Sequence, residues 1–261
     1  MIKSEKVNYE KDWVDDRRSR KAYREWVGPA HHYDANAAMQ FCYATFLGLR
    51  ENHSMLDIGC GSLRGGRLFI SYLLPNKYCG VEPEKWVVEK AIQNEIGQDL
   101  INIKKPRFYH SDDLNLSTFG ESFDFILAQG VFTHAPAIDI KKCLNNASMV
   151  MKKDAIFAAN YFIGEEDYKE DKWLYPKIST FKPETMQAFA DNANLASVPI
   201  SLPHPFGANW IFFCHKSSKE ILKQRVTLMS SFAESLSNCL FDGYGERTLE
   251  HNGLLTMKEP S

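Results

Sequence analysis

Residues 54–66 place one acid and two glycines where a short apolar segment ends and a helix-like stretch begins. Asp57 lies within the apolar segment, and Gly59 and Gly61 follow it. A strand that passes through glycines into a helix turns backbone N–H groups and a helix N-terminus toward a ligand at close range. The stretch therefore predicts a ligand-binding loop.

A second acid, Glu82, ends the next short apolar segment, 77–81. In doubly wound folds, a carboxylate at this place can accept hydrogen bonds from both hydroxyls of a ribose. The glycine loop and Glu82 together predict a ligand that contains a nucleoside.

Two other nucleotide-binding patterns can be compared with the same loop. The dinucleotide fingerprint requires a glycine at the position of Arg64, after Gly59 and Gly61, and that glycine is absent. A P-loop requires Gly-Lys-Ser or Gly-Lys-Thr after the turn, which the sequence also lacks. The loop therefore disfavours both a nicotinamide dinucleotide and a P-loop nucleotide.

Short apolar segments alternate with helix-like stretches from residue 54 onward, which is typical of a parallel sheet covered by helices on both faces. We expect strands near 54–58, 77–81, 106–110, 123–128 and 154–160, and helices near 65–73, 83–97, 136–151 and 180–193. Strands at 196–200 and 209–214 have no helix between them, which favours an antiparallel pair at the sheet edge. Amphipathic helices are expected at 34–49 and 217–240.

The composition is that of a soluble globular protein, with 261 residues of which 44% are hydrophobic and 25% charged. A net charge of −2 provides no general attraction to nucleic acid or to an anionic membrane. No apolar run approaches the ~20 residues that span a bilayer, and the first residues lack the apolar core of a signal peptide. Six scattered cysteines without a Cys-x-x-Cys pair predict reduced thiols in a cytoplasmic protein.

Four segments occur in the order, and at about the spacing, of one enzyme family. They are Leu56-Asp-Ile-Gly-Cys-Gly, Gly-Val-Glu-Pro at 80–83, Ser-Asp-Asp-Leu at 111–114, and Phe-Asp-Phe-Ile-Leu-Ala-Gln-Gly-Val-Phe-Thr-His at 123–134. Over residues 50–215 the chain resembles class I S-adenosylmethionine-dependent methyltransferases of the small-molecule type. The resemblance implies an α/β, Rossmann-like three-layer sandwich whose seven-stranded sheet is parallel except for the last strand. It also implies S-adenosylmethionine as methyl donor and S-adenosylhomocysteine as product.

The resemblance assigns the first cofactor contacts to the loop and to the second acid. Asp57 and the backbone of Gly59, Cys60 and Gly61 would hold the methionine part of the cofactor. Glu82 would hold the ribose hydroxyls, since a carboxylate accepts hydrogen bonds from them.

Further contacts are implied along the chain. Asp112 or Asp113 would meet the adenine amino group, with Asp112 the better match, and Gln129 would line the pocket near the sulfonium. Arg64 could reach the cofactor carboxylate or a substrate anion, or lie on the surface at a helix start. Tyr33 would contact the cofactor if the N-terminal segment closes over it as a lid, and a simple linker is the alternative.

One position departs from the family pattern. The third glycine of the loop is replaced by Leu63, and Gly65 and Gly66 follow. The turn must therefore tolerate a side chain where relatives have none, and the two later glycines could supply flexibility instead.

The acceptor side is expected at the carboxyl ends of the later strands. For a hydroxyl acceptor a base must remove a proton, and His134, after the fourth strand, is the candidate, with a packing role as the alternative. Tyr161, His204 and Trp210 could shape the acceptor pocket, although a core role for Trp210 is equally compatible with its place. The sequence shows no metal-binding cluster.

These patterns divide the chain into a cap or lid at 1–50, a cofactor-binding domain at 51–216, and a helix with a tail at 217–261. We expect methyl transfer to a small molecule at oxygen, such as a sugar, a glycan precursor or a secondary metabolite. The alternatives are a protein methyltransferase and a non-catalytic regulatory protein that binds the cofactor. The helix at 217–240 could also form a homodimer interface.

Overall fold

A computed structural model describes residues 23–200, 202, 204, 206–242, 249–250 and 254–255. The sheet strands are β1 (Met55–Ile58), β2 (Tyr78–Val81), β3 (Arg107–Tyr109), β4 (Phe123–Ala128), β5 (Met151–Ile163), β6 (Thr180–Phe181), β7 (Leu195–Ile200) and β8 (Asn209–His215). The helices are α2 (Tyr33–Phe46), α3 (Gly66–Tyr72), α4 (Lys85–Ala91), α5 (Gln98–Lys104), α6 (Ala137–Val150), α7 (Pro183–Asn192) and α8 (Lys219–Asp242). Short helical turns are η1 (Glu25–Val27), η2 (Ala30–His32), η3 (Ile92–Ile96), η4 (Leu116–Phe119) and η5 (Lys216–Ser218), and β9 (Leu249–Glu250) pairs with β10 (Leu254–Leu255).

The main sheet has the strand order β3-β2-β1-β4-β5-β8-β7, and β6 pairs with β5 beside this path. All strands of the path are parallel except β8, which runs antiparallel to both β5 and β7. The expected Rossmann-like sheet is thus confirmed. The antiparallel strand β8 lies inside the sheet, and β7 forms the edge.

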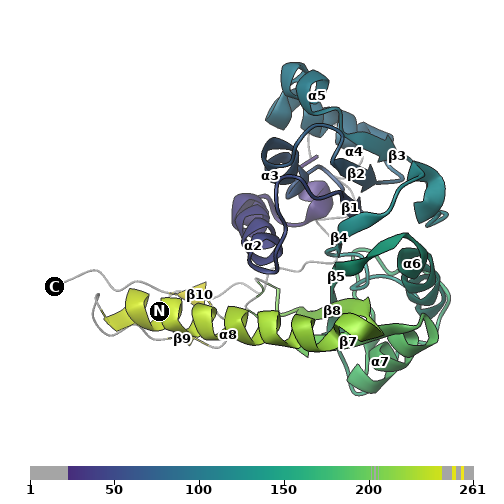
Figure 1. The fold of residues 1–261 in the computed structure, drawn as a ribbon, viewed down its shortest axis with the longest axis vertical. Helices are drawn as coiled ribbons and strands as arrows, with labels where there is room; N and C mark the ends of the chain where they lie inside the picture. The colour runs from purple at the N-terminus through teal and green to yellow at the C-terminus, as the bar shows by residue number, and fades with distance from the viewer. Residues whose placement is uncertain are drawn as a thin grey trace, which may run out of the picture.

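Two layers of helices cover the two faces of this sheet (Figure 1). One face packs against α6 and α7 through buried side chains such as Ile140, Leu144 and Met186. The other face packs against α2, α3, α4 and α8, with Phe69 and Leu222 among its buried side chains. The result is the expected three-layer sandwich. Its strands are buried on both faces, which explains why their sequences are apolar runs.

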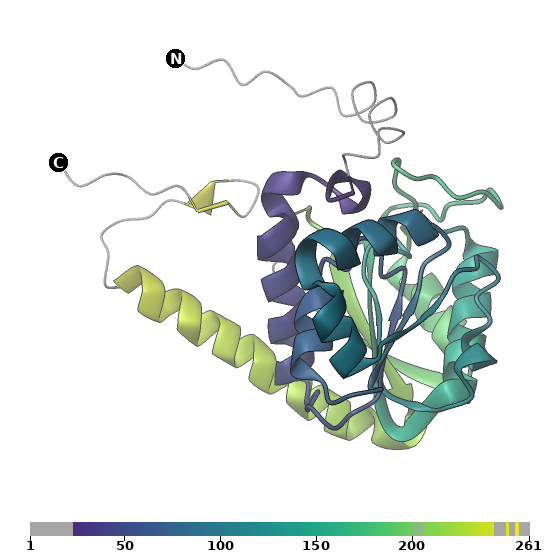
Figure 2. The same ribbon diagram turned by 90° about the horizontal axis from the view of Figure 1, so that it is seen from above.

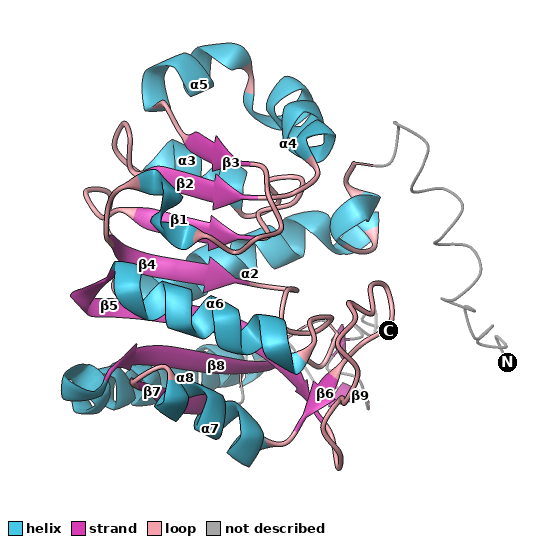
Figure 3. Ribbon diagram, turned by 90° about the vertical axis from the view of Figure 1, so that its right-hand side faces the viewer, coloured by secondary structure: helices cyan, strands magenta, loops and turns pink. Residues whose placement is uncertain are grey.

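The register of the parallel strands brings their carboxyl ends to one edge of the sheet. Asp57 on β1 lies opposite Gly80 on β2 and Leu127 on β4. Figure 3 shows β1, β2, β3 and β4 pointing to the same side of the molecule. Loops that follow these strands therefore converge at this edge, which is where ligands bind in such folds.

The structure departs from the expected elements at a few places. The stretch 83–97 is divided into α4 and the π-helical turn η3, and the additional helix α5 follows. The helix expected from residue 180 begins at Pro183, because residues 180–181 form β6. Pro183 fits the first helical turn, where the N–H that proline lacks would have no partner within the helix.

The C-terminal helix α8 packs on the sheet through its first half, where Leu222, Val226 and Met229 are buried. Figures 1 and 2 show its second half extending away from the sheet. The homodimer expected through this helix remains a prediction. Residues 1–22 of the cap or lid expected at 1–50 lie outside the described residues.

Candidate functional site

The glycine loop between β1 and α3 takes backbone conformations that favour glycine. Gly59 has φ +67° and Gly61 has φ +52°, both in the left-handed region. A Cβ added to Gly59 would lie 2.6 Å from Cγ2 of Val131, and one added to Gly61 would overlap Cγ1 of Val27. The loop thus turns tightly after β1 and lets neighbouring segments approach its backbone.

Leu63 occupies the position where the family pattern has its third glycine, and it has φ +54° with no exposed surface. A buried leucine therefore stabilises, by packing, a turn that would otherwise favour glycine. Gly65 and Gly66 do not supply flexibility, since side chains there would meet Oε1 of Gln40 and the hydroxyl of Tyr78. Their role is close packing of α3.

Glu82 lies directly after β2, beside the glycine loop, and the residue is 7% exposed. Its two oxygens accept hydrogen bonds from the backbone N–H groups of Gly61 and Glu84, each at 3.0 Å. Burial raises the pKa of Glu82, although these two hydrogen bonds oppose the shift. Each oxygen keeps a lone pair for a further donor, as a ribose hydroxyl would supply.

Asp57 lies deeper in the same corner and is 5% exposed. The hydroxyl of Tyr78 donates to its Oδ2 at 2.7 Å. Burial raises the pKa of Asp57 to about 7, with the Tyr78 hydrogen bond and the charge of Arg64 opposing the shift. Near neutral pH the carboxyl is therefore poised between its two protonation states, and a cationic ligand would favour the charged one.

The two acids after β3 have different surroundings. Asp113 accepts hydrogen bonds from the backbone N–H of Asn115 and from the Tyr109 hydroxyl, both at 2.8 Å. The Asn115 hydrogen bond and then the Tyr109 bond lower the pKa of Asp113. Asp113 thus closes a local turn. Asp112 is exposed, as Asp113 is, and stays the candidate for the adenine amino group.

Residues 23–32, which we call the N-terminal cover, lie over the glycine loop. Val27 packs on Gly61, and its carbonyl accepts a hydrogen bond from Nη1 of Arg64 at 2.7 Å. Trp26 contacts Trp86 of α4 edge-on, with ring centroids 5.4 Å apart. Any ligand that reaches the loop from this side must therefore displace the cover.

A buried acid fixes the base of the cover. The side chain of Glu95, in η3, is 5% exposed and accepts hydrogen bonds from Tyr23 and Arg24, each at 2.6 Å, and from Arg67 at 3.2 Å. Tyr33 lies beside this cluster, fully buried, and its hydroxyl donates to the carbonyl of Ser62 at 2.7 Å. Tyr33 thus holds the glycine loop, and a direct cofactor contact by its side chain stays a prediction.

His204 joins the ends of β4 and β5. Its Nε2 lies 3.3 Å from Nε2 of Gln129 and 3.1 Å from Nδ2 of Asn160, and Asn160 also accepts the Gly130 N–H at 2.8 Å. Burial, and then the charge of Arg64, lower the pKa of His204 to about 4. The imidazole is therefore neutral at physiological pH and belongs to a buried polar cluster at the carboxyl edge.

His134 lies after β4, half-buried, on a different set of partners. Its Nδ1 lies 2.6 Å from the carbonyl of Lys177, and its ring meets Tyr175 edge-on at 4.9 Å. A neutral imidazole that donates Nδ1–H to this carbonyl carries its basic lone pair on Nε2. The tautomer suits a proton acceptor, and the same hydrogen bond also anchors the 164–179 loop.

The structure does not bring Tyr161 together with Gln129. Tyr161 faces the α7 side of β5, since successive strand residues point to opposite faces and Asn160 faces His204. It lines a cavity of about 310 Å³ with Glu184 and residues of β7 and α8. Trp210 is 1% exposed and packs in the core beside His204, with ring centroids 6.2 Å apart.

Sequence reasoning missed the N-terminal cover contacts and Glu95. It placed Asn160 and Tyr161 together at the end of the fifth strand, and only one of two neighbouring strand residues can face the end of β4. Trp26 and Val27 carry no periodic pattern, and Glu95 stands in a stretch that reads as an ordinary exposed helix. Their roles depend on contacts between distant segments.

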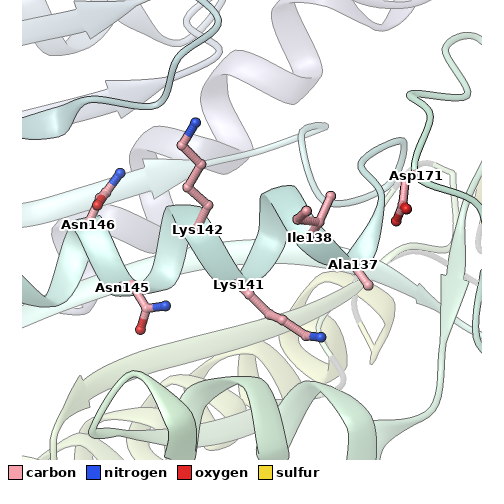
Figure 4. A pocket seen from close by; sticks show the side chains of 7 residues that line it. All are labelled: Ala137, Ile138, Lys141, Lys142, Asn145, Asn146 and Asp171. Carbon is pink, nitrogen blue, oxygen red and sulfur yellow. The ribbon is translucent and has the colours of Figure 1, made fainter.

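A hollow of about 550 Å³ lies on the outer surface along α6. Figure 4 shows Lys141 and Lys142 pointing away from each other there, so they do not converge on one ligand. The hollow lies apart from the glycine loop. Within the described residues there is no group of three or more potential metal ligands, and no helix is long and apolar enough to cross a membrane.

Comparison with known proteins agrees with this geometry. Residues 56–157 match a family model described as a methyltransferase domain. Sterol 24-C-methyltransferase ERG6A of Gibberella zeae is 23% identical over 146 residues, which cover 56% of this chain but only 37% of that protein. Among solved structures, the CcbJ methyltransferase of Streptomyces caelestis and the PH0226 protein of Pyrococcus horikoshii each have a TM-score of 0.53 and 12% identity. Both alignments cover 74% of this chain, and they cover 94% and 95% of those chains, respectively.

Residues 56–157 are therefore similar to a methyltransferase domain, and S-adenosylmethionine is the cofactor that this similarity supports. The residues present suit this cofactor. Glu82 keeps acceptor capacity toward hydroxyl groups, Asp57 can supply a negative charge for a cationic ligand, and the backbone at Gly61 is open to close approach once Val27 moves.

Proposed function

We propose that the protein binds S-adenosylmethionine over the glycine loop and transfers its methyl group to a small-molecule acceptor at oxygen. Glu82 would hold the ribose, Asp57 and the loop backbone the methionine part, and Gln129 would line the pocket near the sulfonium. When bound, the cofactor supplies an activated methyl group for in-line displacement. The protein positions the two reactants and excludes water.

One observation carries this proposal: the carboxylate of Glu82 is fixed beside the glycine loop by backbone N–H groups of both neighbouring segments. A buried carboxylate held in this way is preorganised, so little freedom is lost when hydroxyl groups bind to it. The match of residues 56–157 to the methyltransferase domain supports the same assignment.

The cofactor assignment is tested by calorimetric titration with S-adenosylhomocysteine. Glu82→Ala should weaken binding about tenfold or more, because each lost charged hydrogen bond contributes about 1.5–3 kcal/mol. Glu84→Ala is the matched control, since it removes an exposed acid two residues away and keeps the backbone donor to Glu82. Binding of NADH in preference to S-adenosylhomocysteine would contradict the proposal.

His134 is the proposed base. Its Nδ1 contact with the Lys177 carbonyl favours the tautomer with basic Nε2, and a hydroxyl acceptor requires a proton acceptor during transfer. His134→Gln should lower kcat by about 100-fold, the lower end of the usual base contribution, while the affinity for S-adenosylhomocysteine stays the same. If turnover persists and stability falls, the side chain only anchors the loop.

The acceptor class is tested by following S-adenosylhomocysteine release with panels of sugars, phenols, amines and peptides. Turnover with hydroxylated small molecules supports the proposal. Turnover confined to peptides would favour the protein methyltransferase, with the segments 23–50 and 216–242 as the nearest candidates for a peptide groove. Tight cofactor binding without turnover on any panel would favour a regulatory protein.

A further inference from the structure

Arg64 is a buried cation with unused donor capacity. The residue is 9% exposed, and its Nη1 donates to the carbonyl of Val27. Its Nε is buried and has no hydrogen-bond partner in the described part of the chain. Burial lowers the pKa of Arg64 to about 10, so the guanidinium is still charged at neutral pH. A buried charged donor without an acceptor is costly, which points to a ligand that completes it.

No acid neutralises this guanidinium at close range among the described residues. Asp57 acts on Arg64 through its charge, but it is not within ion-pair distance, and its own hydrogen bond comes from Tyr78. The hydrogen bond to Val27 joins Arg64 to a neutral carbonyl. Burial raises the pKa of Asp57, and a protonated Asp57 leaves Arg64 without a counter-charge from this acid.

The side chain of Arg64 extends toward Gly28 and Phe206, which lie outside the glycine loop. A Cβ added to Gly28 would lie 3.6 Å from Nη1 of Arg64 and 3.9 Å from the ring of Phe206. The charge of Arg64 also helps to lower the pKa of His204, which contacts Gln129 at the end of β4. Arg64 thus lies between the N-terminal cover and the connection that precedes β8.

Two further polar atoms around His204 are buried without a partner in the described residues. They are Oε1 of Gln129, whose amide nitrogen contacts His204, and Nε1 of Trp210, whose ring lies beside it. Gln129 can present either end of its amide, so it can act as donor or acceptor. Buried polar atoms without a partner require an explanation, and a ligand that completes them is the one that this cluster favours.

We propose that the methyl acceptor carries a carboxylate or phosphate group and that Arg64 binds this oxyanion. The inference rests on the function proposed above. A guanidinium binds planar and tetrahedral oxyanions through two parallel N–H donors, and the unpartnered Nε is one of such a pair. Because His204 is neutral, it adds no charge that would bind an anion unselectively. The cofactor's own carboxylate is the competing source of the same chemistry.

The first experiment measures anion binding with small probes. By ¹⁹F NMR, 4-fluorobenzoate and 4-fluorophenyl phosphate are compared with neutral 4-fluorobenzamide, both with and without saturating S-adenosylhomocysteine. At least one anion should bind the wild type about tenfold more tightly than the amide, and Arg64→Gln should abolish this preference. Arg107→Gln, which removes one exposed cation that pairs with Glu121, should leave it unchanged.

The second experiment separates the two sources of the oxyanion. Affinities for S-adenosylhomocysteine and for 5′-methylthioadenosine, which lacks the amino-acid carboxylate, are measured on wild type and Arg64→Gln. The proposal expects both affinities to change less than about threefold. A tenfold loss for S-adenosylhomocysteine alone would assign Arg64 to the cofactor and overturn the proposal.

Equal binding of anions and amide to the wild type would also overturn the proposal. Failure of S-adenosylhomocysteine to bind would instead reject the proposed function. The anion probes are also compared in the absence of S-adenosylhomocysteine, so the two outcomes can be distinguished. If Arg64→Gln does not fold, Arg64→Lys gives the same comparison, since it keeps the charge and loses the Nε donor. For that variant the anion preference should fall and the melting curve should remain cooperative.

Discussion

Val27 of the N-terminal cover lies directly on Gly61 of the glycine loop, so closely that a methyl group added to Gly61 would overlap the valine. The two residues meet at the point where the cofactor is proposed to approach the backbone. The cofactor can therefore reach the backbone of Gly61 only when Val27 has moved away from it.

Gly61→Ala tests this contact. The alanine would be strained at φ +52° by about 1–2 kcal/mol and would also collide with Val27. In the double variant Gly61→Ala with Val27→Ala, we expect the collision to be relieved and the backbone strain at residue 61 to remain. Urea denaturation of the wild type, both single variants and the double variant measures the coupling between the residues. Additive losses would show that the contact is not tight in solution.

Glu95→Gln should loosen the N-terminal cover. The carboxylate accepts three hydrogen bonds from Tyr23, Arg24 and Arg67, so its neutralisation should cost about 1–3 kcal/mol of the free energy of unfolding. Hydrogen exchange of residues 23–33 should become faster. Asp34→Asn is the control, because the Asp34 carboxylate is 69% exposed and its pairs contribute little. Equal effects of the two variants would reject Glu95 as the anchor.

Acid should loosen the same contact. Burial alone would raise the pKa of Glu95, but the hydrogen bonds from Arg24 and Tyr23 outweigh it and lower the pKa. A carboxyl whose pKa is lowered on folding contributes stability above its unfolded pKa, and this contribution is lost as pH falls through the folded pKa. Exchange of residues 23–33 should therefore accelerate at acid pH in the wild type and depend less on pH in Glu95→Gln.

Asp57 should couple cofactor binding to protonation. Its pKa of about 7 in the free protein should fall when a cation binds, so S-adenosylmethionine binding should release protons near neutral pH. Affinity should rise from pH 5.5 to 7 and then level off. S-adenosylhomocysteine lacks the sulfonium charge and should show a weaker rise. Calorimetry in buffers of different ionisation enthalpy measures the protons, and Asp57→Asn should remove the coupling.

The same carboxyl affects stability with the opposite sign to Glu95. Its folded pKa is raised, so its contribution is full below the unfolded pKa and is lost as pH rises through about 7. The free protein with Asp57→Asn should therefore gain stability relative to the wild type as pH increases from 5 to 8. A constant difference across this range would show that Asp57 is ionised throughout.

Leu63 shows how far the sequence could predict the site and where it could not. The departure from glycine was visible in the sequence, and the structure confirms a side chain in a left-handed turn. The complete burial of this side chain stabilises the turn, and this burial depends on helices from elsewhere in the chain. The local sequence therefore could not predict it. Leu63→Gly should relieve strain yet lose stability, since a buried leucine contributes about 2–5 kcal/mol by packing.

The same division holds for the rest of the molecule. The strands were predictable because buried parallel strands must be continuous apolar runs, and Asp57 and Glu82 follow from their places at strand ends. The N-terminal cover was not predictable, because Trp26 and Val27 act through contacts with distant residues such as Trp86 and Gly61 rather than through a repeating pattern.

The hydroxyl of Tyr175 donates to the carbonyl of Trp26 at 2.5 Å, across 149 residues of sequence. This bond ties the N-terminal cover to the 164–179 loop, which comes from the opposite half of the sheet. The two segments therefore have to be exchanged together if this hydrogen bond is to be kept. A chimaera that exchanges either segment alone with a related methyltransferase would lose the contact between them, whereas exchange of both segments together would preserve it.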